Sequence, residues 1–360
     1  MQQGDHYPAQ LNRKRGKRFP LFSVGYWMVA ALYFVMVMYL GLKAQSSEQP
    51  GFGNLAGYGA VVGFSIGLIF GLFPIQNFPV FKSRRTFLSV VITGTIYYSL
   101  FFLAVIFVVS MYGNSITFAS SYVFSPAGLM VPFHFSVSSA LYHFILQVNK
   151  KFGPGVLMEY TIGKYFKPKE EERVFLFLDL KSSTTLAERL DHAEYSRMVS
   201  DCYAELTRPL LAYKARIYQY VGDEVVVSWK INRNFSADLC YEFFYAFIQR
   251  IEARKNHFLR NYGVYPRFKA GLHCGKVTVT QVGEIKTEIA YHGDVVNTAS
   301  RIQSLCNQFQ KELLVSESIL EHLPQKDWSL VSFVANAALK GKEMSTRIFT
   351  INRPDQLALH

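Results

Sequence analysis

Apolar residues fill the first part of the chain in four long runs, whereas the second part has the shorter alternating patterns of a water-soluble domain. The runs lie at about 23–43, 57–76, 87–112 and 127–147, and charged residues are scarce within them. About 20 apolar residues suffice for an α-helix to cross the hydrocarbon core of a bilayer. The pattern predicts a four-helix transmembrane domain over 23–147, preceded by a basic arm at 1–22.

The second run has a glycine at every fourth position, namely Gly59, Gly63, Gly67 and Gly71. This spacing places all four on one face of a helix, where the lack of side chains lets a neighbouring helix approach closely. Glycine is also simply common in membrane helices. We favour a packing face, without inferring a dimer from it.

Positive charge alternates between the segments that connect the runs. Three segments are basic: the N-terminal arm, the 77–86 loop and the stretch after residue 147. The 113–126 loop is uncharged, and the 44–56 loop carries only Glu48, with Lys43 just before it. Since lysine and arginine favour the cytoplasmic side, both termini are expected in the cytoplasm.

The formal net charge of +12 admits nucleic acid, anionic lipid or a polyphosphate as partner. The basic clusters stand beside apolar runs, which favours membrane lipid and argues against nucleic acid. Few ionisable groups interrupt the runs, which weakens a channel or transporter interpretation. His134 and His143, in or near the fourth run, are expected to be packing or interfacial residues. The four cysteines all follow residue 200 without metal-ligand spacing and are expected to be reduced and mostly buried.

Residues 148–172 are predicted to be a coupling linker, because Gly153, Pro154 and Gly155 end the fourth helix and a charged stretch follows. A continuous apolar run then leads from Val174 to Asp179 and predicts a buried strand ending in a carboxylate. Lys181 to Thr185 open a helical pattern, and free backbone amides at a helix start suit phosphate oxygens.

Further along, two strand-like stretches over 215–229 flank Gly222-Asp223, which is a hairpin turn signal. A helix is expected at about 236–261, a strand at 268–280 and another helix from Gly293-Asp294. Asn297 and Arg301 share one face of that last helix. The order of elements predicts an α+β domain, and the chain lacks the glycine-rich nucleotide fingerprints of P-loop and dinucleotide-binding proteins.

These residues suit chemistry on a nucleoside triphosphate. Asp179 and Asp223 could hold Mg²⁺ or Mn²⁺ together with substrate phosphates, and two ions can assist an in-line displacement. Asn297 and Arg301 could donate hydrogen bonds to the charge that develops in the transition state. Taken singly, Asp223 could be only a turn residue and Arg301 only a surface cation. The combination of all four favours a function.

Residues from about 173 to 351 resemble the catalytic domain of class III adenylyl and guanylyl cyclases. The resemblance lies in the stretches 177–184, 220–224, 271–277, 293–301 and 339–342, whose order and spacing fit that family. It implies a ferredoxin-like α+β fold over 173–352, followed by a tail at 353–360. It also implies a head-to-tail homodimer whose active sites are shared between the two subunits.

The same resemblance assigns roles to individual residues. It implies that Asp179 and Asp223, with Leu180 beside them, hold two Mg²⁺ or Mn²⁺ ions, and that Asn297 and Arg301 stabilise the transition state. The remaining positions would bind the triphosphate: the backbone of Leu180, Lys181, Ser182, Ser183 and Thr184, and either Lys342 or Lys340. The ribose 3′-hydroxyl would attack the α-phosphate and release pyrophosphate.

The two positions that select the base in this family are occupied here by Gln219 and Ala290, which are not its usual residues. Glutamine can face either purine, whereas alanine can neither donate nor accept a hydrogen bond. The expectation is an adenylate cyclase using ATP, with GTP or a pyrimidine triphosphate as alternatives. A membrane receptor with a regulatory cyclase-like domain is the main rival. His273, Cys274 and His292, close to these motifs, are expected to be packing or wall residues.

Overall fold

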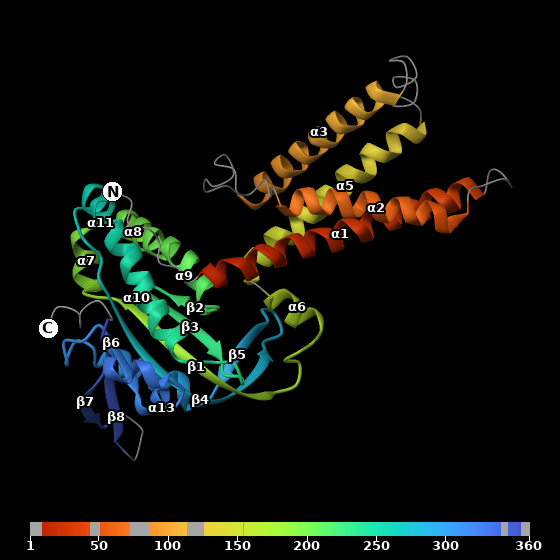
Figure 1. Cartoon of the computed structure of the whole chain (residues 1–360). Helices are drawn as coiled ribbons and strands as arrows, with labels where there is room; N and C mark the ends of the chain where they lie inside the picture. The colour runs from red at the N-terminus through yellow and green to blue at the C-terminus, as the bar shows by residue number, and fades with distance from the viewer. Residues whose placement is uncertain are drawn as a thin grey trace. The chain divides into compact units, whose positions relative to one another are not determined.

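The computed structural model describes residues 9–43, 51–72, 86–113, 126–153, 155–339 and 345–353 (Figure 1). It divides into two compact units. The first unit covers the described residues from Asn12 to Leu157, and the second begins at Met158.

The first unit consists of long helices. They are α1 (Ala9–Lys43), α2 (Phe52–Leu72), α3 (Phe87–Gly113) and α5 (Pro126–Phe152). Four stretches of the described residues are long and apolar enough to cross a membrane: Pro20–Leu40, Phe52–Leu72, Phe87–Ala104 and Leu129–Phe152. Many of their large apolar side chains face outward, such as Leu21, Val29, Tyr58 and Phe133. An outward apolar surface of this kind fits a lipid environment, so the four predicted spans are confirmed.

The helix ends differ from the predicted spans in two places. α1 begins at Ala9, inside the predicted basic arm, because arginine, lysine and leucine are good helix formers that continue the helix backward. α2 begins at Phe52 rather than at residue 57. The Gly51 carbonyl accepts hydrogen bonds from the amides of Asn54 and Leu55 at this helix start. Residues 73–76, at the end of the predicted second span, lie outside the described residues.

The glycine face of α2 packs against α1, as predicted. A Cβ added to Gly67 would lie 2.4 Å from the Cα atom of Val24, and one on Gly63 would lie 2.6 Å from the carbonyl oxygen of Trp27. These contacts are with backbone atoms, which cannot move aside without shifting the helix. The glycines therefore set the distance between α1 and α2.

Aromatic side chains fill the interior of this unit. The buried set is Trp27, Phe70, Tyr98, Phe135 and Tyr142. His143 is also buried, with its ring 4.7 Å from that of Tyr98, and Gly94 leaves room for it. His134 contacts the carbonyl oxygen of Ala30 at 3.1 Å. Both histidines are thus packing residues.

Replacing Gly67 with alanine should loosen the α1–α2 contact, because the new methyl group meets backbone. We expect Gly67→Ala to lower bundle stability by about 1–3 kcal/mol, the usual range for overpacking. Thermal unfolding in detergent, followed by size-exclusion chromatography, measures this. Gly57→Ala is the matched control, since a Cβ there meets nothing within 4 Å. Equal melting temperatures for the two variants would contradict the packing role of Gly67.

The second unit is built on an eight-stranded mixed sheet with the order β2-β3-β1-β4-β6-β8-β7, and β5 pairs with β4. Its strands are β1 (Lys169–Leu180), β2 (Arg216–Val221), β3 (Glu224–Lys230), β4 (Phe268–Val282), β5 (Glu288–His292), β6 (Leu313–Ser316), β7 (Val331–Ala337) and β8 (Thr346–Ile351). β1 pairs antiparallel with both β3 and β4. The antiparallel order β2-β3-β1-β4, with a helical connection on each side of the β2–β3 hairpin, is the predicted ferredoxin-like arrangement.

Helices cover both faces of this sheet. On one face, α8 (His192–Glu205) and α10 (Asp238–Ala253) bury the even-numbered residues of β1, from Val174 to Leu180 (Figure 1). On the other face, α12 (Asp294–Ser304) packs on Phe175, Phe177 and their neighbours. The remaining helices are α6 (Val156–Thr161), α7 (Ser183–Arg189), α9 (Thr207–Ala212), α11 (Lys255–Tyr262), α13 (Glu317–Leu320) and the 3-10 helix η3 (Gln325–Leu330).

Two predicted helices are each divided in the structure. The pattern after Lys181 forms α7 and α8, because the side chain of Asp191 accepts from the Glu194 amide at 2.7 Å and begins a new helix. The stretch 236–261 forms α10 and α11, with the break at Arg254.

The predicted linker at 148–172 is wrong in two respects, because α5 continues to Phe152 and β1 begins at Lys169. Gly153, with a φ of +89°, ends α5 as predicted. The charged start of β1 belongs to the sheet because Glu171 and Arg173 point inward as a buried ion pair at 3.0 Å. The charged residues at the start of β1 were therefore assigned to a linker although they form part of a strand.

Candidate functional site

Three charged residues form a row across the sheet where β1 ends. In the strand register, Asp179 of β1 lies between Glu224 of β3 and Lys269 of β4. The Lys269 ammonium forms an ion pair with the Asp179 carboxylate at 3.2 Å. Because these residues are directly cross-strand neighbours, their side chains share one face of the sheet, the face that carries α12.

Asp223 lies next to this row, in the turn between β2 and β3. Gly222 has a φ of +61°, which glycine adopts without strain, and its carbonyl accepts from the Tyr203 hydroxyl at 3.2 Å. The predicted hairpin is confirmed, and it brings the second aspartate close enough for its charge to act on Asp179. The predicted pair of carboxylates therefore meets at one place.

The electrostatics of this cluster favour an added cation. Burial is the largest of the causes that raise the pKa of Glu224 to about 7, and the negative charges of Asp179 and Asp223 also raise it. Burial likewise raises the pKa of Asp179, and the charge of Asp223 adds to this, although Lys269 acts in the opposite direction. Three neighbouring carboxyl groups thus have one nearby lysine as countercharge among the described residues, a composition that suits a divalent cation.

Gln303 of α12 holds the Asp179 carboxylate from above the sheet, through a hydrogen bond of 2.8 Å. α12 can approach this closely because Gly271 of β4 has no side chain. A Cβ there would lie 2.2 Å from the Gln303 amide nitrogen. Gly271 and Gln303 together fix the orientation of Asp179.

The described side chains contain no group of three His, Cys, Asp or Glu that could hold a metal by itself. Mg²⁺ is commonly bound by one or two carboxylates plus substrate phosphates, so this finding agrees with a site that the substrate completes. Asp179 and Asp223 fit that kind of site.

The segment proposed for phosphate binding is a tight turn from β1 into α7. Ser182 has a left-handed backbone (φ 55°, ψ 36°) and makes no side-chain cap. The Lys181 amide already donates to the Arg267 carbonyl at 2.8 Å, and the Leu180 side chain is buried. The amides from Ser182 to Thr184 remain suited to phosphate, because the first amides of a helix have no intrahelical acceptor.

Asn297 and Arg301 lie on the outer face of α12, away from Asp179 and Asp223. The opposite face of the helix is buried and carries Val295, Ala299 and Gln303. Arg301 is 3.9 Å from the Asp294 carboxylate of the same helix, and its Nη1 atom is buried without a hydrogen-bond partner among the described residues. The structure therefore brings the two aspartates together, but it does not bring Asn297 and Arg301 to them within one chain.

Gln219 and Ala290 lie on β2 and β5, which are joined through aromatic side chains. The rings of Tyr218 and Tyr291, one residue from each, are 4.8 Å apart. The two positions thus belong to one region of the domain. Lys340 and Lys342 lie outside the described residues.

The cysteines and His273 near the motifs are packed within the fold, as expected, whereas the His292 side chain is exposed. All four cysteines are free and buried. The His273 imidazole contacts the Ser316 hydroxyl at 2.7 Å, and the Cys274 thiol donates to the Ser318 carbonyl. His292 is the last residue of β5, where it pairs with Thr278.

Sequence reasoning missed Lys269 and Gln303, which contact Asp179 directly. Lys269 precedes Gly271 by two residues and therefore shares its sheet face, which is a usable signal only once the β1–β4 register is known. Gln303 lies two residues beyond Arg301, and its inward direction follows from the helical phase of α12.

The fold and the clustered carboxylates are those of a class III nucleotidyl cyclase domain. The family model for the adenylate and guanylate cyclase catalytic domain matches residues 166–352, and the chain belongs to this family. The match begins ahead of the predicted boundary at residue 173, in agreement with the early start of β1.

Individual relatives agree with this assignment. Adenylate cyclase 2 of Rhizobium meliloti (strain 1021) is 32% identical over 208 residues, which are 58% of this chain and 57% of the relative. Adenylate cyclase of Anabaena cylindrica is 24% identical over 49% of this chain and 36% of the relative. The matched part of the chain thus covers 57% of the length of the Rhizobium protein and 36% of the length of the Anabaena protein. A bacterial light-regulated adenylyl cyclase has the same fold, with a TM-score of 0.54 at 18% identity, over 66% of this chain and 70% of that chain.

Removing one charge from the carboxylate cluster should stabilise the metal-free protein. In EDTA we expect Asp223→Asn to raise the unfolding free energy by about 0.5–1 kcal/mol, because it relieves repulsion on Asp179 and Glu224. The variant should also lose the stabilisation that Mn²⁺ gives the unsubstituted protein. Thermal unfolding with EDTA and with Mn²⁺ measures both effects. Glu188→Gln, at an exposed position of α7, is the control, and an Asp223→Asn variant still stabilised by Mn²⁺ would contradict the assignment.

Proposed function

We propose that this protein is a membrane-bound adenylate cyclase that converts ATP to cyclic AMP and pyrophosphate. The observation that carries the proposal is the meeting of Asp179 and Asp223 in a cluster short of positive charge, on the fold of the cyclase family. The names of the curated relatives support ATP as the substrate. The alternating loop charge supports a catalytic domain on the cytoplasmic side of the membrane, and the organisms of the relatives support a bacterial inner membrane.

Asp179 and Asp223 would hold two Mg²⁺ or Mn²⁺ ions with the phosphates, and the ions would supply activation of the attacking hydroxyl and neutralisation of the leaving pyrophosphate. The protein's own residues would do the rest. Gln303 and Lys269 keep the Asp179 carboxylate in place. The backbone amides from Ser182 to Thr184 would donate hydrogen bonds to phosphate oxygens. Lys340 or Lys342 would hold the triphosphate.

We further propose that the active site is completed by a second copy of the chain. Asn297 and Arg301 are turned away from Asp179 and Asp223 of their own chain, and the buried Nη1 atom of Arg301 makes no hydrogen bond with the residues that the structure describes. Donors that act on a transition state must reach the reacting phosphate. A symmetric dimer in which α12 of each subunit faces the carboxylates of the other would give two complete sites.

Mixing two inactive variants tests this division of the site. We expect Asp223→Ala to abolish turnover without unfolding the domain, because a hairpin turn tolerates the change. Arg301→Ala should lower kcat about a hundredfold with little effect on substrate affinity, since it removes an interaction made in the transition state. When the two variants are coexpressed, the mixed dimer keeps one intact site, and activity should return to about one quarter of the unsubstituted level.

The coexpression experiment includes a control for gene dosage. Asp223→Ala coexpressed with Asp179→Ala places both lesions on the same half of the site, and activity should stay absent. Recovery in this control, or none in the first mixture, would contradict a shared site.

The base is the open part of the proposal, because Gln219 and Ala290 replace the usual selectors. The decisive experiment gives the full-length protein ATP, GTP, CTP and UTP separately with Mn²⁺ and identifies cyclic products by mass spectrometry. We expect cyclic AMP as the main product. Gln219→Ala should change the ratio of kcat/KM between ATP and GTP by about tenfold, because a lost hydrogen bond to the base discriminates between substrates. Tyr220→Ala, at the neighbouring exposed position, is the control. A cyclic product from another triphosphate would reassign the substrate, and the absence of any product from a folded dimer would favour a regulatory domain.

A further inference from the structure

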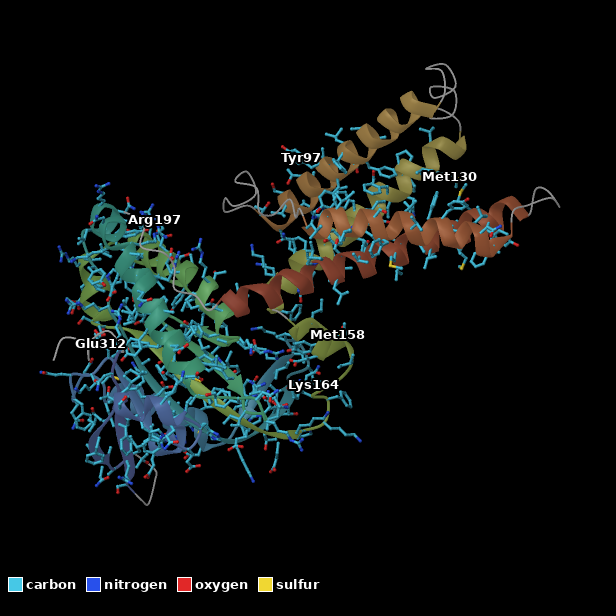
Figure 2. The ribbon with its side chains drawn as sticks, in the orientation of Figure 1. Tyr97, Met130, Met158, Lys164, Arg197 and Glu312 are labelled. Carbon is cyan, nitrogen blue, oxygen red and sulfur yellow. The ribbon has the colours of Figure 1, made fainter. Side chains whose placement is uncertain are left out.

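Residues 158–168, called here the coupling segment, have two faces of different character. The segment contains the end of α6 and the loop that leads into β1 (Figure 2, where Met158 and Lys164 are labelled). One face is fixed to the sheet, and the other exposes large apolar side chains.

The inner face is held by a polar network. Glu159 accepts from Arg216 of β2 at 2.9 Å and from Lys164 at 2.6 Å. Burial acts to raise the pKa of Glu159, but the hydrogen bonds from Arg216 and Lys164 outweigh it and keep that pKa below its ordinary value. Glu159 is therefore an ionised and well-paired carboxylate that ties α6 to β2.

Two tyrosines hold the rest of the segment. Tyr165 is buried, its hydroxyl donates to Glu171 at 3.0 Å, and its carbonyl accepts from the Gln281 amide at 2.9 Å. The Tyr160 hydroxyl donates to the Thr287 carbonyl at 3.2 Å, close to β5. The segment is thus anchored to β2, β4 and the start of β5.

The outer face is apolar and ordered. Met158, Ile162 and Phe166 are 63%, 64% and 77% exposed and recur at intervals of four residues. Gly163, with a φ of +61°, closes the end of α6, where the Lys164 amide donates to the Glu159 carbonyl and the Gly163 amide donates to the Tyr160 carbonyl. These bonds hold the exposed side chains in defined places, so their exposure is not that of a frayed end.

The surroundings of this face identify its partner. Met158 comes six residues after Phe152, the last residue of α5, so the chain keeps it within ~20 Å of the end of a membrane helix. Lys150 and Lys151 stand in the last turn of α5, and Lys167 and Lys169 are exposed beside Phe166.

The nearby acidic residues do not cancel this positive charge. Glu159 is paired with Arg216 and Lys164, and the exposed Glu172 lies opposite Lys276 in the strand register, so the exposed Glu170 offsets one of the four lysine charges. Apolar side chains bordered by lysines match the boundary between acyl chains and anionic head groups.

We propose that Met158, Ile162 and Phe166 insert into the surface of an anionic bilayer, with Lys167 and Lys169 on the lipid head groups. The coupling segment then connects lipid contact to β2 and β5, the strands that carry Gln219 and Ala290. The proposal concerns a surface outside the catalytic site and does not depend on which nucleotide is used.

Lipid quenching of a fluorescent label tests the contact directly. In the full-length protein, Phe166→Cys carries the environment-sensitive dye NBD, and Phe333→Cys on β7, also an exposed phenylalanine, is the matched control. The four native cysteines are buried, and the unsubstituted protein measures background labelling. The proteins are placed in phosphatidylcholine nanodiscs with or without about 30% phosphatidylglycerol, including lipid spin-labelled near the head group.

We expect spin-labelled lipid to quench the label at position 166 at least about twofold more than the label at 333. Omitting phosphatidylglycerol, or reversing charge with Lys167→Glu and Lys169→Glu together, should reduce that quenching. Lys326→Glu is the control for charge reversal.

Two outcomes would overturn the proposal. A label at 166 that iodide quenches from water while spin-labelled lipid does not would show a surface that stays in solvent. A label protected from both quenchers, together with disulfide-linked dimers of unlabelled Phe166→Cys on oxidation, would show that a second copy covers this face. None of these readouts requires enzyme activity, so failure here and failure of the proposed function are separable.

Discussion

The pairing of β1 with both β3 and β4 is the constraint on which the rest of the domain depends. It places Asp179 between Glu224 and Lys269 on one face of the sheet, and it places Val174, Leu176 and Leu178 in the core on the other. A slip of one residue would exchange these faces, placing the Asp179 carboxylate in the core beneath α8 and α10 and the leucines on the face that α12 covers. The apolar core therefore enforces the geometry of the carboxylate cluster, since the same register determines both.

The carboxyl groups that suit this cluster for binding a cation also lower the stability of the metal-free fold. The raised pKa values of Glu224 and Asp179 mean that the fold holds these groups at a cost in free energy when no cation is bound. Gln303 and Lys269 reduce that cost but leave a deficit of positive charge. A site that is unfavourable by itself and favourable with a cation is what a substrate-completed metal site requires, and the proposed function uses this property.

Much of this arrangement can be predicted from the sequence, and the limits have physical reasons. Long apolar runs and the Gly222-Asp223 turn are local signals, so the four helices and the hairpin were predicted. The glycine face of α2 was predicted for the same reason, because its spacing is complete within one helix. Lys269 and Gln303 were missed because their contacts with Asp179 depend on strand register and helix phase, which one sequence does not display. The start of β1 was mistaken for a linker because Glu171 and Arg173 neutralise each other inside the fold, so charge there does not mark solvent.

The outward face of α12 has a consequence for how activity would depend on abundance. If Asn297 and Arg301 serve the carboxylates of a second chain, an isolated subunit has no working site. Molecules confined to a membrane meet by diffusion in two dimensions, so the fraction of paired subunits depends on the number per unit of bilayer area. At low density, output would then rise roughly with the square of expression. The orientation of two side chains on one helix would make cyclic-nucleotide synthesis a threshold response to crowding of the protein in its own membrane.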